Sequence, residues 1–144
     1  QVVDNAKHLS NKLKEYWFKI ISGWTDNHLI LIDVFGSFWV TWKQAEKSLE
    51  LVWLSTNKNM IPYDPRKPLD PSWIRIWTPA ITTRWMKESE MEIIWEIIFK
   101  TISTLKKYVV DDSVKAFENI ELINELNVLK WEVLNISKKF PIYR

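Results

Sequence analysis

The side chains able to act as nucleophiles, metal ligands or general acids form no known catalytic pattern in this chain. Its 144 residues contain no cysteine, which excludes a disulfide, a thiolate metal site and a cysteine nucleophile. The two histidines, His8 and His28, lie far apart in the sequence, and neither belongs to a metal-binding motif such as H-E-x-x-H. We therefore predict no metal site.

Acidic side chains gather at Glu88, Glu90, Glu92 and Glu96, where two of them could pair as a general acid and base or bind a metal. The Glu-x-x-His pattern of di-iron helix bundles is absent. An acidic first helical turn explains these residues, because carboxylates interact favourably with the N-terminal end of the helix dipole. Glycine-rich phosphate loops, G-x-S-x-G and H-x-E are also missing. We predict no catalytic residue, no cofactor and no enzymatic activity.

Basic residues gather in two groups. Lys7 and Lys14 flank the apolar stripe of the first predicted helix on one side, and Lys12 and Lys19 flank it on the other. Such an arrangement can contact a phosphate backbone or an anionic membrane surface, although lysines that extend from a bundle helix into water explain it equally well. The second group lies near three tryptophans and comprises Arg75, Arg84 and Lys87. Arginine beside tryptophan suits stacking, phosphate contact or a protein interface.

Tryptophan is the most unusual component, with ten residues against only two glycines. Five of the tryptophans fall beside the predicted helical stripes, and these are Trp17, Trp24, Trp39, Trp53 and Trp131. Because tryptophan is enriched at protein interfaces and at membrane surfaces, we expect these five to be exposed interface residues. The net charge of +2 is mild, so any nucleic-acid contact must depend on local charge.

The elements that position these residues are predicted from apolar spacings of three and four residues. These spacings indicate helices at about 3–22, 27–56, 72–109 with a break near Pro79, and 112–138. A Pro-rich segment, 57–71, connects the second helix to the third. We therefore predict an all-α fold, a four-helix bundle of long amphipathic helices with one Pro-rich connection, formed by residues 1–144 as a single helical domain.

Two segments also fit strands. Residues 29–42 can form a β-hairpin that turns at Gly36 and Ser37, because the flanks are rich in Ile, Val, Phe and Trp. We favour the helix, because its apolar stripe crosses Gly36 in register and continues into good helix formers. Residues 73–77 fit a short strand as well as they fit a helix. The apolar run 29–42 is too short to span a bilayer.

The absence of cysteine, the abundance of Ile, Lys, Asn and Trp, the long heptad helices and the basic flanks of the first helix together resemble the major coat proteins of filamentous and rod-shaped archaeal viruses. The resemblance implies a structural coat protein that assembles helically around double-stranded DNA in a virion, assembled in the host cytoplasm. It implies other coat subunits, the DNA and a lipid envelope as partners. Both basic groups would contact the phosphate backbone without sequence specificity.

The alternative function comes from a different class. It is a helical module that binds a membrane surface or another protein through its tryptophans and has no nucleic-acid role.

Overall fold

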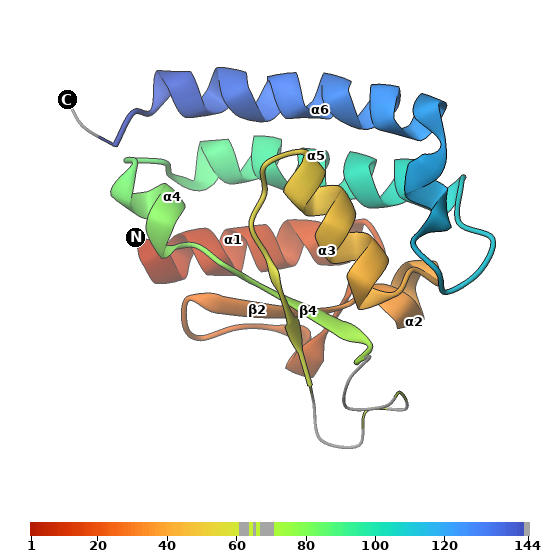
Figure 1. The fold of residues 1–144 in the computed structure, drawn as a ribbon. Helices are drawn as coiled ribbons and strands as arrows, with labels where there is room; N and C mark the ends of the chain where they lie inside the picture. Colours follow the sequence, from red (N-terminus) through yellow and green to blue (C-terminus); the bar gives the residue numbers. More distant parts are fainter. Residues whose placement is uncertain (61–63, 65, 67–70, 143–144) are drawn as a thin grey trace.

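The computed structural model describes residues 1–60, 64, 66 and 71–142, which form a mixed α/β fold (Figure 1). The helices are α1 (Val2–Glu15), α2 (Val34–Phe38), α3 (Trp42–Leu51), α4 (Pro79–Thr83), α5 (Glu88–Lys106) and α6 (Ile120–Lys139), with the 3-10 turns η1 (Ile21–Gly23) and η2 (Lys115–Glu118). The strands are β1 (Lys19–Ile20), β2 (Leu29–Asp33), β3 (Asn57–Asn59) and β4 (Trp73–Trp77). The predicted all-α four-helix bundle is therefore wrong.

The four strands form one antiparallel sheet in the order β1-β2-β4-β3. Ile30 of β2 pairs with Ile76 of β4, and Ile32 pairs with Ile74, and all four side chains are buried. Because successive side chains of a strand point to opposite faces, Arg75 lies on the other face of the sheet. The sheet thus has an apolar face on the core and a partly open face that carries Arg75.

Three long helices stack on the sheet in layers (Figure 1). In Figure 1, α1 lies nearest β2, α5 lies on α1, and α6 lies on the far side of α5, while α3 crosses in front of α5. Leu13 of α1, Ile102 of α5 and Leu126 of α6 are buried in the shared core. A fully buried Leu or Ile side chain stabilises a fold by about 1.5–3 kcal/mol, so these apolar rows fix the layers.

The first predicted helix, 3–22, is wrong beyond Glu15. At the end of α1 the backbone turns into the left-handed region at Trp17, whose φ is 62°. The N–H of Phe18 then donates to the carbonyl oxygen of Leu13 at 3.1 Å, and the chain continues into β1. The apolar spacing continues through this turn, which is why periodicity alone extended the helix too far.

The second predicted helix, 27–56, is wrong because the segment divides into β2, α2 and α3. A carboxylate oxygen of Asp33 accepts a hydrogen bond from the N–H of Gly36 at 2.6 Å and so begins α2. Thr41 and Gln44 form a capping box that begins α3. The β-hairpin alternative has the strand but is wrong at its turn, because Gly36 and Ser37 lie inside α2.

The later segments also differ from the predicted helices. In place of a helix over 72–109, the chain forms β4, then α4 with Pro79 in its first turn, then α5. Proline is tolerated there because its missing N–H has no partner in a first turn. The predicted helix 112–138 begins later, as η2 followed by α6.

The predicted loop 57–71 begins instead with β3. Its residues Pro62, Pro65 and Pro68 lie outside the described part of the chain. In the described part, no helix has the length and apolar character needed to cross a membrane.

Candidate functional site

Arg75 lies at the centre of β4, on the partly open face of the sheet. It pairs with Leu31 of β2 on one side and with Asn57 of β3 on the other. Its neighbours in the strand, Ile74 and Ile76, are buried on the opposite face, which anchors the backbone of Arg75 in the core. A charged side chain is thereby held on a rigid strand and not on a mobile loop.

The guanidinium group of Arg75 is oriented but not neutralised. Its Nε donates a hydrogen bond to Oδ1 of Asn57 at 3.0 Å, and its Cζ lies 6.0 Å from the ring centroid of Trp77. Among the described residues, no carboxylate forms an ion pair with it. The terminal nitrogens therefore keep the fork that binds carboxylates and phosphates through two parallel hydrogen bonds.

Two hollows meet at Arg75. One has a volume of about 370 Å³ and is lined mainly by the segment between η1 and β2, with Thr25, Asp26, Asn27 and Asn59 as polar groups. The other is more open and has a volume of about 530 Å³. It is lined by His28, Leu29, Asn57, Arg75, Trp77 and Pro79. Hollows of this size suit a small molecule, and convergent polar groups would fix its orientation.

Hydrogen bonds hold the segment before β2 in one conformation. Thr25 Oγ1 donates to the carbonyl oxygen of Leu29 at 2.7 Å, and the N–H of Leu29 donates to Oδ1 of Asn27 at 2.8 Å. The carbonyl oxygen of His28 accepts from the N–H of Thr78 at 3.3 Å, which ties the segment to the end of β4. The His28 side chain is exposed beside the second hollow, where an imidazole can donate or accept a hydrogen bond.

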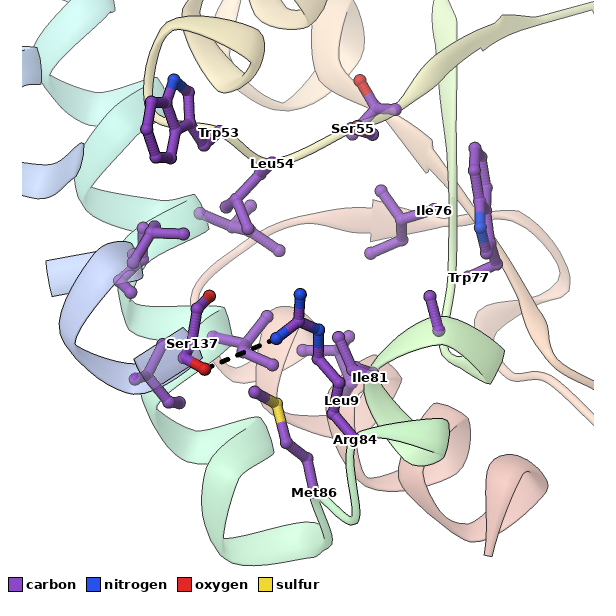
Figure 2. Close-up of a pocket in the computed structure, with 17 residues that line it drawn as sticks. Leu9, Trp53, Leu54, Ser55, Ile76, Trp77, Ile81, Arg84, Met86 and Ser137 are labelled. Carbon is purple, nitrogen blue, oxygen red and sulfur yellow. Dashed lines mark hydrogen bonds between the residues drawn. The ribbon is translucent and has the colours of Figure 1, made fainter. Parts of the chain in front are cut away.

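Another groove, of about 310 Å³, is mainly apolar and is lined by α4, α5 and α6, by the segment 53–56 after α3, and by residues of α1 and β4 (Figure 2). Its cationic group is Arg84, which Figure 2 shows reaching toward Ser137. Arg84 Nη1 donates to the carbonyl oxygens of Phe140 at 2.9 Å and of Ser137 at 3.4 Å, at the end of α6. These carbonyls have no partner within the helix, so Arg84 caps α6 and fastens it to α4.

The basic group of the first helix is largely engaged within the protein. Lys12 lies 3.4 Å from a carboxylate oxygen of Glu92, and Lys19 lies 3.3 Å from one of Asp33. Lys14 Nζ donates to the carbonyl oxygen of Gly23 at 2.6 Å. The carboxylates offset the positive charges of Lys12 and Lys19, and the main-chain carbonyl holds the ammonium group of Lys14 within the protein.

Two further residues that were predicted to contact phosphate are exposed on the surface, Lys7 and Lys87. Lys7 is exposed beside a small hollow that Trp24 also lines. Lys87 is exposed and precedes α5 as its N-cap. Lys7 and Lys87 thus belong to different elements, with Lys7 on α1 and Lys87 at the start of α5.

The acidic group at the start of α5 has a structural centre in Glu92. Its carboxylate accepts from Trp95 Nε1 at 3.0 Å, lies 2.8 Å from His8 Nε2, and forms the ion pair with Lys12. The hydrogen bond from Trp95, together with those from His8 and Lys12, lowers the pKa of the Glu92 carboxyl below its ordinary value. Glu92 therefore joins α1 to α5 as a carboxylate. The described residues contain no cluster of three or more potential acidic, His or Cys metal ligands.

The five tryptophans singled out in the sequence are all exposed, and these are Trp17, Trp24, Trp39, Trp53 and Trp131. Trp85, which is not one of these five, is exposed as well. The role of the five as interface residues stays a prediction.

These features define a mixed α/β domain in which an antiparallel sheet packs on helices and the guanidinium of Arg75 lies in a polar hollow. The family model for serine hydroxymethyltransferase matches residues 1–98. A serine hydroxymethyltransferase of Mycoplasma capricolum subsp. capricolum is 40% identical over 144 residues, which cover 100% of this chain and 31% of that relative. The chain belongs to the serine hydroxymethyltransferase family, and it spans about a third of the length of the relative that it matches.

This membership corrects the functional expectations. The resemblance to archaeal viral coat proteins is wrong, and so are the virion localisation and the coat-subunit, double-stranded DNA and lipid-envelope partners, because the matching relative is an enzyme of a cellular organism. The expectation of no enzymatic activity is wrong because the family is one of enzymes. The alternative, a membrane-surface or protein-interaction module, has no support either.

Sequence reasoning singled out Arg75 but expected it to contact phosphate in DNA. It missed Asn27, His28 and Asn57, which surround Arg75 in the structure. One sequence feature could have found the first two: the run Thr25 to His28 is polar throughout and directly precedes a short apolar segment. Such a run is typical of a functional loop that leads into a buried strand.

Proposed function

We propose that this chain is the part of a serine hydroxymethyltransferase that binds the carboxylate of the amino-acid substrate, and that Arg75 binds it. The observation that carries the proposal is the guanidinium of Arg75, which has no carboxylate partner among the described residues and opens on polar hollows. The name of the matching relative refers to serine, whose carboxylate is ionised at neutral pH. A guanidinium fork is complementary to that group.

The surroundings of Arg75 support a specific role and not a general attraction. Asn57 holds Nε, so that the edge of the guanidinium with the terminal nitrogens is left for the ligand. The main chain of β4 is fixed by pairing on both sides, which limits the freedom that binding would remove. The guanidinium therefore meets the ligand in an arrangement that needs little rearrangement.

Steady-state kinetics of the complete enzyme test the proposal with the variants Arg75→Ala and Arg75→Lys. A hydrogen-bonded charge pair contributes about 1.5–3 kcal/mol, so we expect R75A to raise KM for serine roughly 10- to 100-fold. R75K keeps the charge but loses the fork, and we expect it to recover only part of the affinity.

The matched control is Lys58→Ala, which removes an exposed cation from the neighbouring strand β3 on the opposite face to Asn57. It should leave KM for serine unchanged. If R75A and K58A raised KM by the same small factor, Arg75 would contribute only to the general electrostatic field, and the proposal would be wrong.

A further inference from the structure

Tryptophan occupies backbone positions that favour glycine. Among the described residues, five non-glycine residues have positive φ, and four of them are tryptophans, at 62° for Trp17, 59° for Trp39, 67° for Trp53 and 68° for Trp85. The fifth is Ser22. In this region the Cβ atom of an L-residue crowds the backbone, and a bulky residue there is a rare outlier. A chain with ten tryptophans has no physical reason to place them here.

All four positions lie at the ends of helices. At the end of α1, the N–H of Trp17 donates to the carbonyl oxygen of Lys14, and that of Phe18 donates to that of Leu13, both at 3.1 Å. The ends of α3 and α4 have the same pair of hydrogen bonds, again with a tryptophan at the left-handed position. Trp39 is itself the left-handed C-cap of α2. This is the Schellman or αL helix ending, whose left-handed residue is usually glycine.

The indole rings at these positions are largely exposed to solvent. The exposed fractions are 78% for Trp17, 72% for Trp39, 56% for Trp53 and 64% for Trp85. Lys130 Nζ lies 4.5 Å from the centroid of the Trp53 ring, and the Trp39 ring lies 5.5 Å from that of Phe35, so these two rings have contacts but remain mostly exposed. None of the four anchors the core, so packing does not explain why tryptophan stands where the backbone favours glycine.

Two further tryptophans, Trp42 and Trp73, are buried and have a different defect. The indole Nε1–H groups of both are enclosed and have no hydrogen-bond acceptor among the residues that the structure describes. Buried indoles usually find a partner for this group. A residue without a polar side chain would remove the unpaired donor at either position.

The composition fits the same explanation. An average chain is about 7% glycine, which corresponds to about ten residues in a chain of this length. This chain has two glycines and ten tryptophans. Counted together, the tryptophans and glycines of this chain therefore come close to the number of glycines in an average chain of this length.

We propose that Trp17, Trp39, Trp53 and Trp85 are glycine positions, and that the cell which makes this protein inserts glycine at them. The proposed cause is one codon that this cell translates as glycine and that the sequence above gives as tryptophan. UGA is such a codon, because its meaning already varies between stop and tryptophan among genetic codes and it differs from the glycine codon GGA by a single base. A tRNA for glycine with one altered anticodon base would read it.

Tandem mass spectrometry of the protein isolated from its own cells tests the proposal directly. Peptides that cover the four positions should have the mass of glycine at each, lower by the indolylmethyl side chain. The spectra should also give glycine at Trp42 and Trp73 if the same codon encodes them. Tryptophan at any of the four left-handed positions in the native protein would overturn the proposal.

The folding argument has a separate test in the recombinant chain. The variant W17G/W39G/W53G/W85G should unfold at a higher temperature and at a higher urea concentration than the chain with four tryptophans. The matched control is Trp131→Gly, which makes the same change at an exposed position inside α6, where φ is not positive. That control should lower both midpoints, because glycine weakens a helix interior. A fourfold variant no more stable than the original chain would show that the four turns do not favour glycine.

Discussion

Replacing Gln44 should separate α3 from the connection between α5 and α6. The Gln44 side chain is fully buried and uses all of its hydrogen-bonding groups. Its Oε1 accepts from the N–H of Thr41 at 2.9 Å, and its Nε2 donates to the carbonyl oxygens of Asp111 at 2.7 Å and Ser113 at 2.6 Å. One amide thus caps α3 and holds a segment that is distant in the sequence.

The variant Gln44→Met keeps the approximate size of the side chain and removes all three hydrogen bonds. The buried N–H of Thr41 would lose its partner at a cost of about 1–3 kcal/mol. The two carbonyl groups belong to less buried residues that water can reach, so each adds about 0.5–1 kcal/mol. We expect Q44M to lower the free energy of unfolding by about 3 kcal/mol.

The variant Gln44→Glu tests whether the donor matters more than the volume. A carboxylate has no donor and would face two carbonyl oxygens in a buried site, so its folded-state pKa should be raised. A raised folded-state pKa means that stability is lost as pH rises through it. Q44E should therefore be less stable than Q44M at neutral pH and should recover as the pH is lowered.

Urea unfolding followed by far-ultraviolet circular dichroism measures both variants. The control Asn127→Met introduces the same side chain at an exposed position of α6 and should change the stability by less than about 0.5 kcal/mol. A loss below about 1 kcal/mol for Q44M would refute the reasoning, because the three hydrogen bonds would then contribute nothing beyond what water supplies.

Two further predictions concern single contacts. Gly36→Ala would place a Cβ 2.3 Å from Oδ2 of Asp33 and displace the carboxylate that begins α2. We therefore expect the free energy of unfolding, measured by thermal unfolding, to fall by about 1–2 kcal/mol. The fall should be smaller in an Asp33→Ala background, and equal falls in both backgrounds would contradict the clash. The hydrogen bond from Tyr108 lowers the pKa of the Glu125 carboxyl and raises that of Tyr108 to about 12. Tyr108→Phe should move the Glu125 pKa up toward its ordinary value in an NMR titration. Because a lowered carboxyl pKa stabilises the fold above its unfolded-state value, the variant should also lose less stability on acidification, and an unmoved Glu125 titration would refute this assignment.

Part of the fold can be predicted from the sequence. The predicted helices 3–22, 72–109 and 112–138 overlap α1, α5 and α6 but extend beyond them, because apolar spacing detects the long face that each helix buries in the shared core and does not detect where the helix ends. The strand alternative for Trp73–Trp77 is confirmed. The sheet could not be predicted, because its central strands β2 and β4 have only five residues each, and over such a length apolar spacing does not distinguish a strand from a buried helical turn.

The site was less accessible to prediction than the fold. Arg75 acquires its surroundings from Asn57 and from the segment around His28, which come from separate strands and meet only through the register of the sheet. No linear motif of the kind considered in the sequence contains these residues, so spacing could not reveal them. The partners of the lysines that flank the first predicted helix could not be predicted for a related reason. These partners, Glu92 and Asp33, come from other elements.

Part of the error in the helix boundaries has a common origin in the positions where we propose glycine. The predicted helix 3–22 runs past Trp17, and the predicted helix 27–56 runs past Trp39 and Trp53. Glycine after the last residue of an apolar pattern is the usual mark of a helix end, and tryptophan carries no such mark. With glycine at these positions, the same rules would end α1, α2 and α3 near the residues where they end in the structure.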